Sequence, residues 1–173
     1  YVGREFPERL VIEVQERKAV ALVKKDNSFY LLDLDGVVFK KLESSDESDL
    51  PALTGCYHEG KLNPHLLLKS LELLRYLSAS KEFPNIRASA EVHVDEVFGF
   101  SLFTDNGLCL RLGYDHYENK IKRLIPVMAD LERRNISLKY LLIDLADPTK
   151  ITVQKKNILP PAEPERPVKG YRT

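Results

Sequence analysis

The 173-residue chain has no tryptophan and only two cysteines, Cys56 and Cys109. Two cysteines cannot make a disulfide framework, and neither belongs to a CxxC pair of the kind that binds zinc. We expect two free thiols, although one disulfide between them is possible, since sequence gives no distance. The four histidines are scattered, without an HExxH-type pair. The sequence therefore predicts no metal site and no cofactor.

The chain also lacks an excess of charge of either sign, because 26 Lys and Arg balance 26 Asp and Glu. No global field therefore directs it toward nucleic acid or acidic lipid. It contains no signal peptide and no apolar run long enough to span a bilayer, so any membrane segment would precede Tyr1. Since the chain begins without Met, we expect a piece of a longer protein. Its 43% apolar residues suffice to bury a core.

What the sequence does contain is a series of short extended segments. Asp35-Gly36 and Asn106-Gly107 are turn signals of the kind that join hairpins. The acidic stretch 43–49 is expected to be a solvated loop. Alternating or continuous apolar residues predict about eight strands, at residues 10–14, 29–34, 37–39, 87–94, 98–103, 108–112, 140–145 and 151–154, with a further extended stretch at 19–23.

Two helices are expected. Asn63-Pro64 should open the first, because Asn caps a helix and Pro at its first position loses no needed donor. The second covers residues 117–134; Pro126 should kink it or shift its start, and Asn135 should end it. Together these elements predict an α+β fold with a largely antiparallel, twisted β-sheet and two helices packed on one face.

One phrase, FYLLDLDGVVF at residues 29–39, matches the first motif of haloacid-dehalogenase-like phosphatases. In that reading Asp33 is the nucleophile, Asp35 the general acid, and both help to hold magnesium. Thr104 would supply the second motif and Asp144 with Asp147 the acidic magnesium motif. The phrase alone thus suggests a magnesium-dependent phosphatase.

The expected architecture argues against that enzyme. A parallel phosphatase sheet needs a crossover of about a dozen residues or more after each strand, usually a helix. No helix is expected between Gly36 and Asn63, and only two are expected in all. The simpler interpretation makes Asp35-Gly36 a hairpin turn and Asp33 an ordinary strand residue. The phosphatase remains the alternative hypothesis.

Six phrases in order resemble the extracytoplasmic part of the bacterial cell-division protein family FtsQ/DivIB, over about residues 6–155. Each phrase is only moderately specific, and their order and spacing give the resemblance its strength. They are FPERLVIEVQERKAVAL at 6–22, YLLDLDGVVF at 30–39, LPALTG at 50–55, LCLRLG at 108–113, RLIPVMADL at 123–131 and YLLIDLAD at 140–147.

The resemblance implies a non-enzymatic, single-pass protein of the inner (cytoplasmic) membrane, with this part on the periplasmic or extracytoplasmic side at the division septum. It implies three segments: residues 1–22 as the end of a POTRA domain, 23–157 as a β domain, and 158–173 as a Pro-rich disordered tail. A promiscuous POTRA-type chaperone or transport module is a third possible class.

Family members are scaffolds that bind FtsB and FtsL, and their C-terminal strand accepts a strand from FtsB. The last strand expected here, 151–154, is a natural edge, because the prolines that follow cannot pair. The expected partner surface is Thr149, Ile151, Thr152, Val153 and Lys155. The simpler alternative is a plain edge strand whose Ile151 and Val153 face the core.

The chain departs from the family pattern near this strand. Asp147 and Lys155 stand where family members can have Tyr and Trp, so aromatic anchors common in interfaces are missing. The first helix could add charged contacts through Lys69, Glu72 or Arg75, but a solvated helix face is the simpler interpretation.

Overall fold

A computed structural model describes residues 2–5, 9–12, 16–43, 46, 49–81, 83–84 and 89–155, the first two ranges by their backbone alone. Strands β1 (Val2–Glu5) and β2 (Arg9–Ile12) form a separate antiparallel pair. The predicted tail, 158–173, lies outside the described residues. Neither described helix is both long and apolar enough to cross a membrane.

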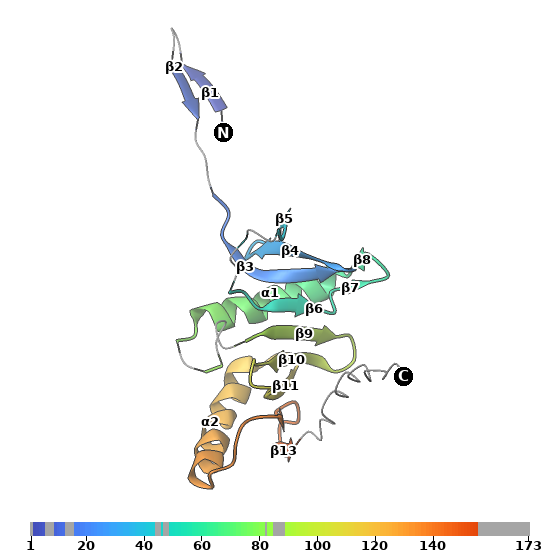
Figure 1. The fold of residues 1–173 in the computed structure, drawn as a ribbon, viewed down its shortest axis with the longest axis vertical. Helices are drawn as coiled ribbons and strands as arrows, with labels where there is room; N and C mark the ends of the chain where they lie inside the picture. The colour runs from blue at the N-terminus through green and yellow to red at the C-terminus, as the bar shows by residue number, and fades with distance from the viewer. Residues whose placement is uncertain are drawn as a thin grey trace, which may run out of the picture.

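The main body is a nine-stranded sheet in the order β13-β12-β11-β10-β9-β6-β3-β4-β5 (Figure 1). A short pair, β7 (Tyr57–His58) and β8 (Lys61–Leu62), stands apart from it. The strands of the main sheet are β3 (Ala19–Lys25), β4 (Ser28–Asp33), β5 (Val38–Lys41), β6 (Ala52–Thr54), β9 (Glu91–Asp95), β10 (Gly99–Phe103), β11 (Cys109–Gly113), β12 (Leu141–Asp144) and β13 (Thr152–Lys155).

Most neighbouring strands in this sheet are antiparallel, as expected, but three pairs are parallel: β3 with β6, β6 with β9, and β11 with β12. A parallel pair needs a crossover, and the two helices supply two of them. Helix α1 (Pro64–Ala79) lies between β6 and β9 in the chain, and α2 (Tyr117–Arg133) between β11 and β12. The α+β prediction is confirmed, but the predicted strands did not include β6, which lies in the middle of the sheet.

Cross-strand register places one apolar row on the same face of seven strands. Its first six members are almost fully buried, whereas the last, on β13, is 39% exposed. The row consists of Val23, Leu53, Val92, Leu102, Leu110, Ile143 and Val153, each in register with the next. The core therefore extends across most of the sheet and ends at its β13 edge.

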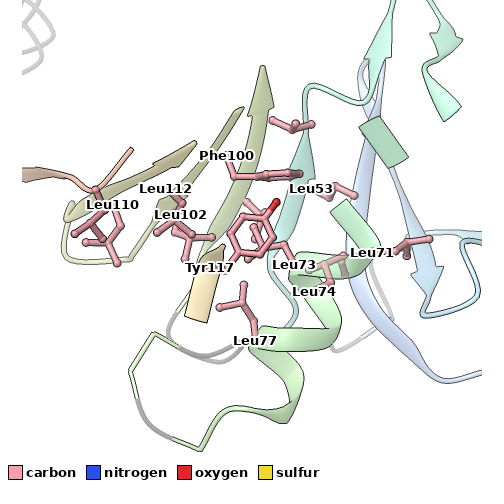
Figure 2. Packing of buried hydrophobic residues seen from close by; sticks show 14 of the residues in the cluster. Leu53, Leu71, Leu73, Leu74, Leu77, Phe100, Leu102, Leu110, Leu112 and Tyr117 are labelled. Carbon is pink, nitrogen blue, oxygen red and sulfur yellow. The ribbon is translucent and has the colours of Figure 1, made fainter. Parts of the chain in front are cut away.

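Both helices cover this apolar face, as predicted. The ring of Tyr117 on α2 meets Phe100 of β10 edge-on at 6.0 Å between centroids. Leu73 and Leu74 of α1 are fully buried in the same cluster, beside Leu53 of β6 (Figure 2). Burial of this much apolar surface is the main force holding the helices on the sheet.

The helix ends follow their local signals. The side chain of Asn63 accepts hydrogen bonds from the amides of His65 and Leu66, which makes it the expected N-cap of α1. Helix α2 ends at Arg133, and Asn135 has the expected positive φ of 55°. Pro126 did not shift the start of α2, because the helix begins at Tyr117 and continues past the proline.

The opposite face of the sheet is polar along one row, and neither helix of the described residues lies on it. Thr54, His93, Ser101, Arg111, Asp144 and Thr152 follow one another in register. The possible disulfide does not form. Cys56 contacts Ser70 of α1 at 3.4 Å, whereas Cys109 is in register with Leu142 on the helix-free face.

Candidate functional site

The C-terminal edge of the sheet is strand β13, one residue later than predicted (Figure 1). Three residues of the expected partner surface, Thr152, Val153 and Lys155, lie on this strand. Thr149 and Ile151 precede it, and Ile151 packs against the core. Within the described residues, β13 pairs with β12 on one side and with no strand on the other. Its outer backbone groups are thus available to a further strand.

The turn before β13 is built by Asp147. Its Oδ1 accepts hydrogen bonds from the amide and hydroxyl of Thr149, at 2.7 and 2.6 Å, and from the amide of Lys150. The hydroxyl and amide of Thr149 hold the pKa of Asp147 below its usual value. Arg123 of α2 donates to the carbonyl oxygen of Asp147 at 2.9 Å. Asp147 therefore directs the chain into the edge strand.

The two faces of β13 differ in chemistry. Val153 continues the buried apolar row beside Ile143, and its partial exposure leaves the end of that row only partly covered by the described residues. Thr152 lies in register with Asp144, which pairs with Arg111 at 3.2 Å on the helix-free face. An adjoining strand would thus meet an apolar side chain on one face and polar side chains on the other.

The other edge of the sheet, β5, has a different character. It ends in Lys40 and Lys41, both exposed, and the Nζ of Lys40 pairs with Asp46 at 2.6 Å. Lysines on an edge strand disfavour pairing with another chain. Strand β5 thus carries two exposed lysines that oppose pairing, whereas β13 carries one, Lys155, at its end.

The charged residues of α1 are engaged within the domain. Lys69 pairs with Asp115 at 2.9 Å and with Glu72 at 3.5 Å, and Arg75 donates to the carbonyl oxygen of Leu34 at 2.6 Å. The contacts with Asp115 and Leu34 tie α1 to loops of the same domain, whereas the Lys69–Glu72 pair lies within the helix. They do not form part of the β13 edge.

Sequence comparison identifies the family. A profile described as "Cell division protein FtsQ/DivIB, C-terminal" matches residues 21–146. The chain belongs to the FtsQ/DivIB family. Cell division protein FtsQ from Syntrophotalea carbinolica is 35% identical over 146 residues, covering 81% of this chain and 51% of that protein. FtsQ from Anaeromyxobacter sp. (strain K) is 36% identical over 149 residues, covering 83% and 50%.

FtsQ from Geotalea daltonii is 32% identical over 160 residues, covering 89% of this chain and 57% of that protein. The chain thus spans about half the length of the curated FtsQ relatives it matches. Among solved structures, the major extracytoplasmic domain of the trans isomer of DivIB from Geobacillus stearothermophilus aligns with a TM-score of 0.43 and 19% identity. That alignment covers 69% of this chain and 98% of the DivIB chain.

An ion pair that was not predicted from the sequence joins two of the segments that resemble FtsQ/DivIB. Arg17, in the phrase ERKAVAL, pairs with Asp33 at 2.6 Å. The other carboxylate oxygen of Asp33 accepts hydrogen bonds from the amides of Val37 (2.8 Å) and Asp35 (3.0 Å). Asp33 is only 5% exposed, so the expectation of an ordinary strand residue was wrong. It is the internal acceptor that shapes the β4–β5 turn.

This environment also sets the charge of Asp33. Burial by itself would raise the pKa of the carboxyl group, but the amide of Val37 and the guanidinium of Arg17 bring it below its usual value. The carboxylate is thus held ionised by the chain itself. Gly36, with φ of 83°, completes the turn; a Cβ there would lie 2.9 Å from Leu71 of α1.

The residues of the phosphatase hypothesis do not converge in this FtsQ/DivIB domain. Asp33 ends β4, Thr104 follows β10, and Asp144 ends β12. In the sheet order β10 and β4 are four strand spacings apart, or roughly 19 Å at about 4.8 Å each, and β12 is two spacings further. A nucleophile and its magnesium ligands must lie within a few ångströms, so no such site is assembled. None of the comparisons supports the phosphatase.

Proposed function

We propose that this chain is the partner-binding domain of a non-catalytic cell-division scaffold, and that it takes up a segment of FtsB as an added strand along β13. The observation that carries the proposal is the apolar row that crosses the sheet and ends on exposed Val153. A strand added beside β13 would extend this row and cover Val153, while backbone hydrogen bonds supply affinity.

The geometry suggests a role for each residue of the surface. The backbone from Thr152 to Lys155 would form the ladder with the partner strand. Val153 would select an apolar partner side chain on the helix-covered face, and Thr152 a polar one on the other face. Thr149 and Ile151 would hold the residues just before the strand in place. Thr149 does so through its hydrogen bonds to Asp147, and Ile151 by packing against the core. FtsL would join the assembly as the second partner of the scaffold.

We further propose that the whole protein is anchored in the inner membrane by one helix preceding residue 1, with this domain on the extracytoplasmic side at the septum. Residues before β3 would close a POTRA domain, and the β domain would begin with β3. A boundary before Ala19, in place of the expected one after residue 22, would keep the strand Ala19–Lys25 in one domain. Recovery of the full-length protein in the soluble fraction of cells would contradict the anchor.

The edge hypothesis is tested by titrating the 173-residue chain with a soluble segment of FtsB from the same genome. Neighbouring amides in a strand point to opposite sides, so of Thr152→Pro and Val153→Pro one removes a donor to the partner and the other a donor to β12. We expect one of these variants to bind at least about tenfold more weakly while its urea midpoint stays near that of the parent chain.

Lys41→Pro is the matched control, because it places the same residue on the opposite edge, β5. It should leave FtsB binding unchanged. Parent-like affinity in both β13 variants would refute strand addition there. Equal binding of unrelated strand-forming peptides would favour a promiscuous chaperone, and magnesium-dependent phosphatase activity abolished by Asp33→Asn would favour the enzyme.

A further inference from the structure

A second surface, separate from the β13 edge, lies at the turn that joins β9 to β10, at the right end of the sheet in Figure 1. Its tip is apolar: Val97 is 79% exposed and Phe98 66% exposed. Turn tips ordinarily carry Gly, Asn, Asp, Pro or Ser, which suit tight backbone and water. Two adjacent large apolar residues at such a tip lose free energy to water unless something covers them.

Hydrogen bonds within the chain fix the backbone of this tip. One carboxylate oxygen of Asp95 accepts hydrogen bonds from the amides of Val97 (2.8 Å) and Phe98 (2.9 Å). The hydroxyl of Tyr114 donates to the carbonyl oxygen of Asp95 at 2.6 Å. Gly99 has a φ of 72°, and a Cβ there would lie 2.5 Å from the backbone of Gly113, so only glycine fits. A preformed tip loses little conformational entropy when a partner binds it.

The tip is also bordered by negative charge. Asp95 keeps a lowered pKa because the amides of Phe98 and Val97 stabilise its carboxylate. Glu96 accepts a hydrogen bond from the Asn63 side chain at 2.9 Å. Within the part of the chain that the structure describes, neither carboxylate has a Lys or Arg ion-pair partner, whereas nearby Lys69 is engaged by Asp115. The tip thus combines apolar surface with uncompensated negative charge.

The turn stands between two hollows. One, of about 390 Å³, is lined by Tyr57, His58 and His93 together with Val97. The other, of about 420 Å³, is lined by residues at the start of α1 and by Tyr114. Glu96 borders both. A side chain that packs on Val97 can therefore continue into a concave surface instead of lying on a flat one.

We propose that the β9–β10 turn is a second protein-docking surface, and that its partner is a polypeptide segment with an apolar side chain next to a Lys or Arg. The apolar side chain would cover Val97 and Phe98, and the cation would approach Glu96. A bilayer is the weaker fit, because anionic headgroups repel Asp95 and Glu96, and burying those carboxylates in the interface is costly.

The surface does not depend on strand addition. In the sheet order, β10 and β13 are three spacings apart, roughly 14 Å at about 4.8 Å each. A partner can therefore occupy the turn while a strand lies along β13. Failure of FtsB binding at β13 would leave this inference standing, and the reverse also holds.

The test uses a phage-displayed library of random dodecapeptides selected on the 173-residue chain. The variants are Val97→Ser/Phe98→Ser, which removes the apolar tip, and Glu96→Gln, which removes one charge. Leu68→Ser is the matched control, because Leu68 is 63% exposed on α1 yet lies outside both hollows. Circular dichroism will show whether each variant is folded. If the double variant is unfolded, Val97→Ser alone takes its place.

We expect the selected peptides to carry Lys or Arg beside an apolar residue. A synthetic peptide of the selected sequence should bind the double variant at least about tenfold more weakly, as expected for loss of interface anchors. It should bind Glu96→Gln about twofold to fivefold more weakly, as for an exposed ion pair, and Leu68→Ser as tightly as the parent.

Three results would overturn the proposal. The first is a selection that yields no peptide sensitive to the loss of Val97 and Phe98. The second is a set of peptides without a cation, bound equally by Glu96→Gln. The third is binding of the parent chain to vesicles of phosphatidylglycerol and phosphatidylethanolamine that disappears in the double variant, which would make the surface a membrane contact.

Discussion

Replacement of Asp33 tests whether its carboxylate has a structural role or a catalytic one. Its two oxygens take up two backbone amides and the Arg17 guanidinium, so Asp33→Ala leaves the amides of Asp35 and Val37 without their acceptor. Each lost hydrogen bond to a charged group that leaves a partly buried donor unpaired costs about 1–3 kcal/mol. The variant should therefore lose about 2–5 kcal/mol of the roughly 5–15 kcal/mol that holds a domain together.

Two companion variants divide this cost. Asp33→Asn keeps an oxygen for the two amides and should lose only about 1–2 kcal/mol, because those bonds become neutral and the ion pair disappears. Arg17→Ala should lose about 0.5 kcal/mol, since the Arg17 side chain is 48% exposed and such pairs are weak. A loss of stability that is largest for Asp33→Ala, smaller for Asp33→Asn and smallest for Arg17→Ala would indicate a carboxylate that shapes a turn.

Urea unfolding followed by far-ultraviolet circular dichroism measures these differences, since the chain has no tryptophan to report by fluorescence. The lowered pKa of Asp33 adds a pH test. The unfolded carboxyl group, near its ordinary pKa of about 3.9, binds a proton more readily than the folded one. The stabilisation is thus complete above that pH and falls as pH drops toward the folded pKa.

The difference in free energy of unfolding between the parent chain and Asp33→Asn should accordingly become smaller as the pH falls below about 4. An Asp33→Ala variant with the urea midpoint of the parent would refute this reasoning. A difference between the parent chain and Asp33→Asn that grows as the pH falls would refute it as well.

Two further predictions concern local geometry. Gly55→Ala should cost at least about 3 kcal/mol or prevent folding, because its φ is 88° and the new Cβ would lie 1.8 Å from the carbonyl oxygen of Val94; soluble protein with an unchanged urea midpoint would contradict this. Asn63→Ala should lose about 1 kcal/mol with the N-cap of α1, visible as a lower Tm. Asn63→Ser keeps a capping oxygen and adds no charge beside Glu96, to which Asn63 donates, so its Tm should lie nearer that of the parent. Equal Tm values for the two Asn63 variants would argue against the cap.

Local signals predicted much of this fold. Asn63-Pro64 marked the start of α1, and Asn106-Gly107 and Asp35-Gly36 marked two turns, because each residue acts on its own backbone. The apolar patterns of the longer strands predicted one buried face. These signals are contained in a few neighbouring residues, so sequence alone reveals them.

Features that depend on distant neighbours were missed. Strand β6 has only three residues, too few for a periodicity, and it is a strand because β3 and β9 pair with it on both sides. The pairing of Arg17 with Asp33 joins two phrases that were read separately.

The position of β6 has a consequence for how this chain folds. The strands on either side of it, β3–β5 and β9–β11, are antiparallel meanders that close over short loops, and such local contacts form quickly. Joining them requires Ala52 to pair with both Leu22 and Glu91, far away in the chain in both directions. Loop-closure entropy makes such non-local pairing slow. The two meanders should therefore form early and dock late. Strand β6, the shortest in the main sheet, should be the last to complete its pairing with both.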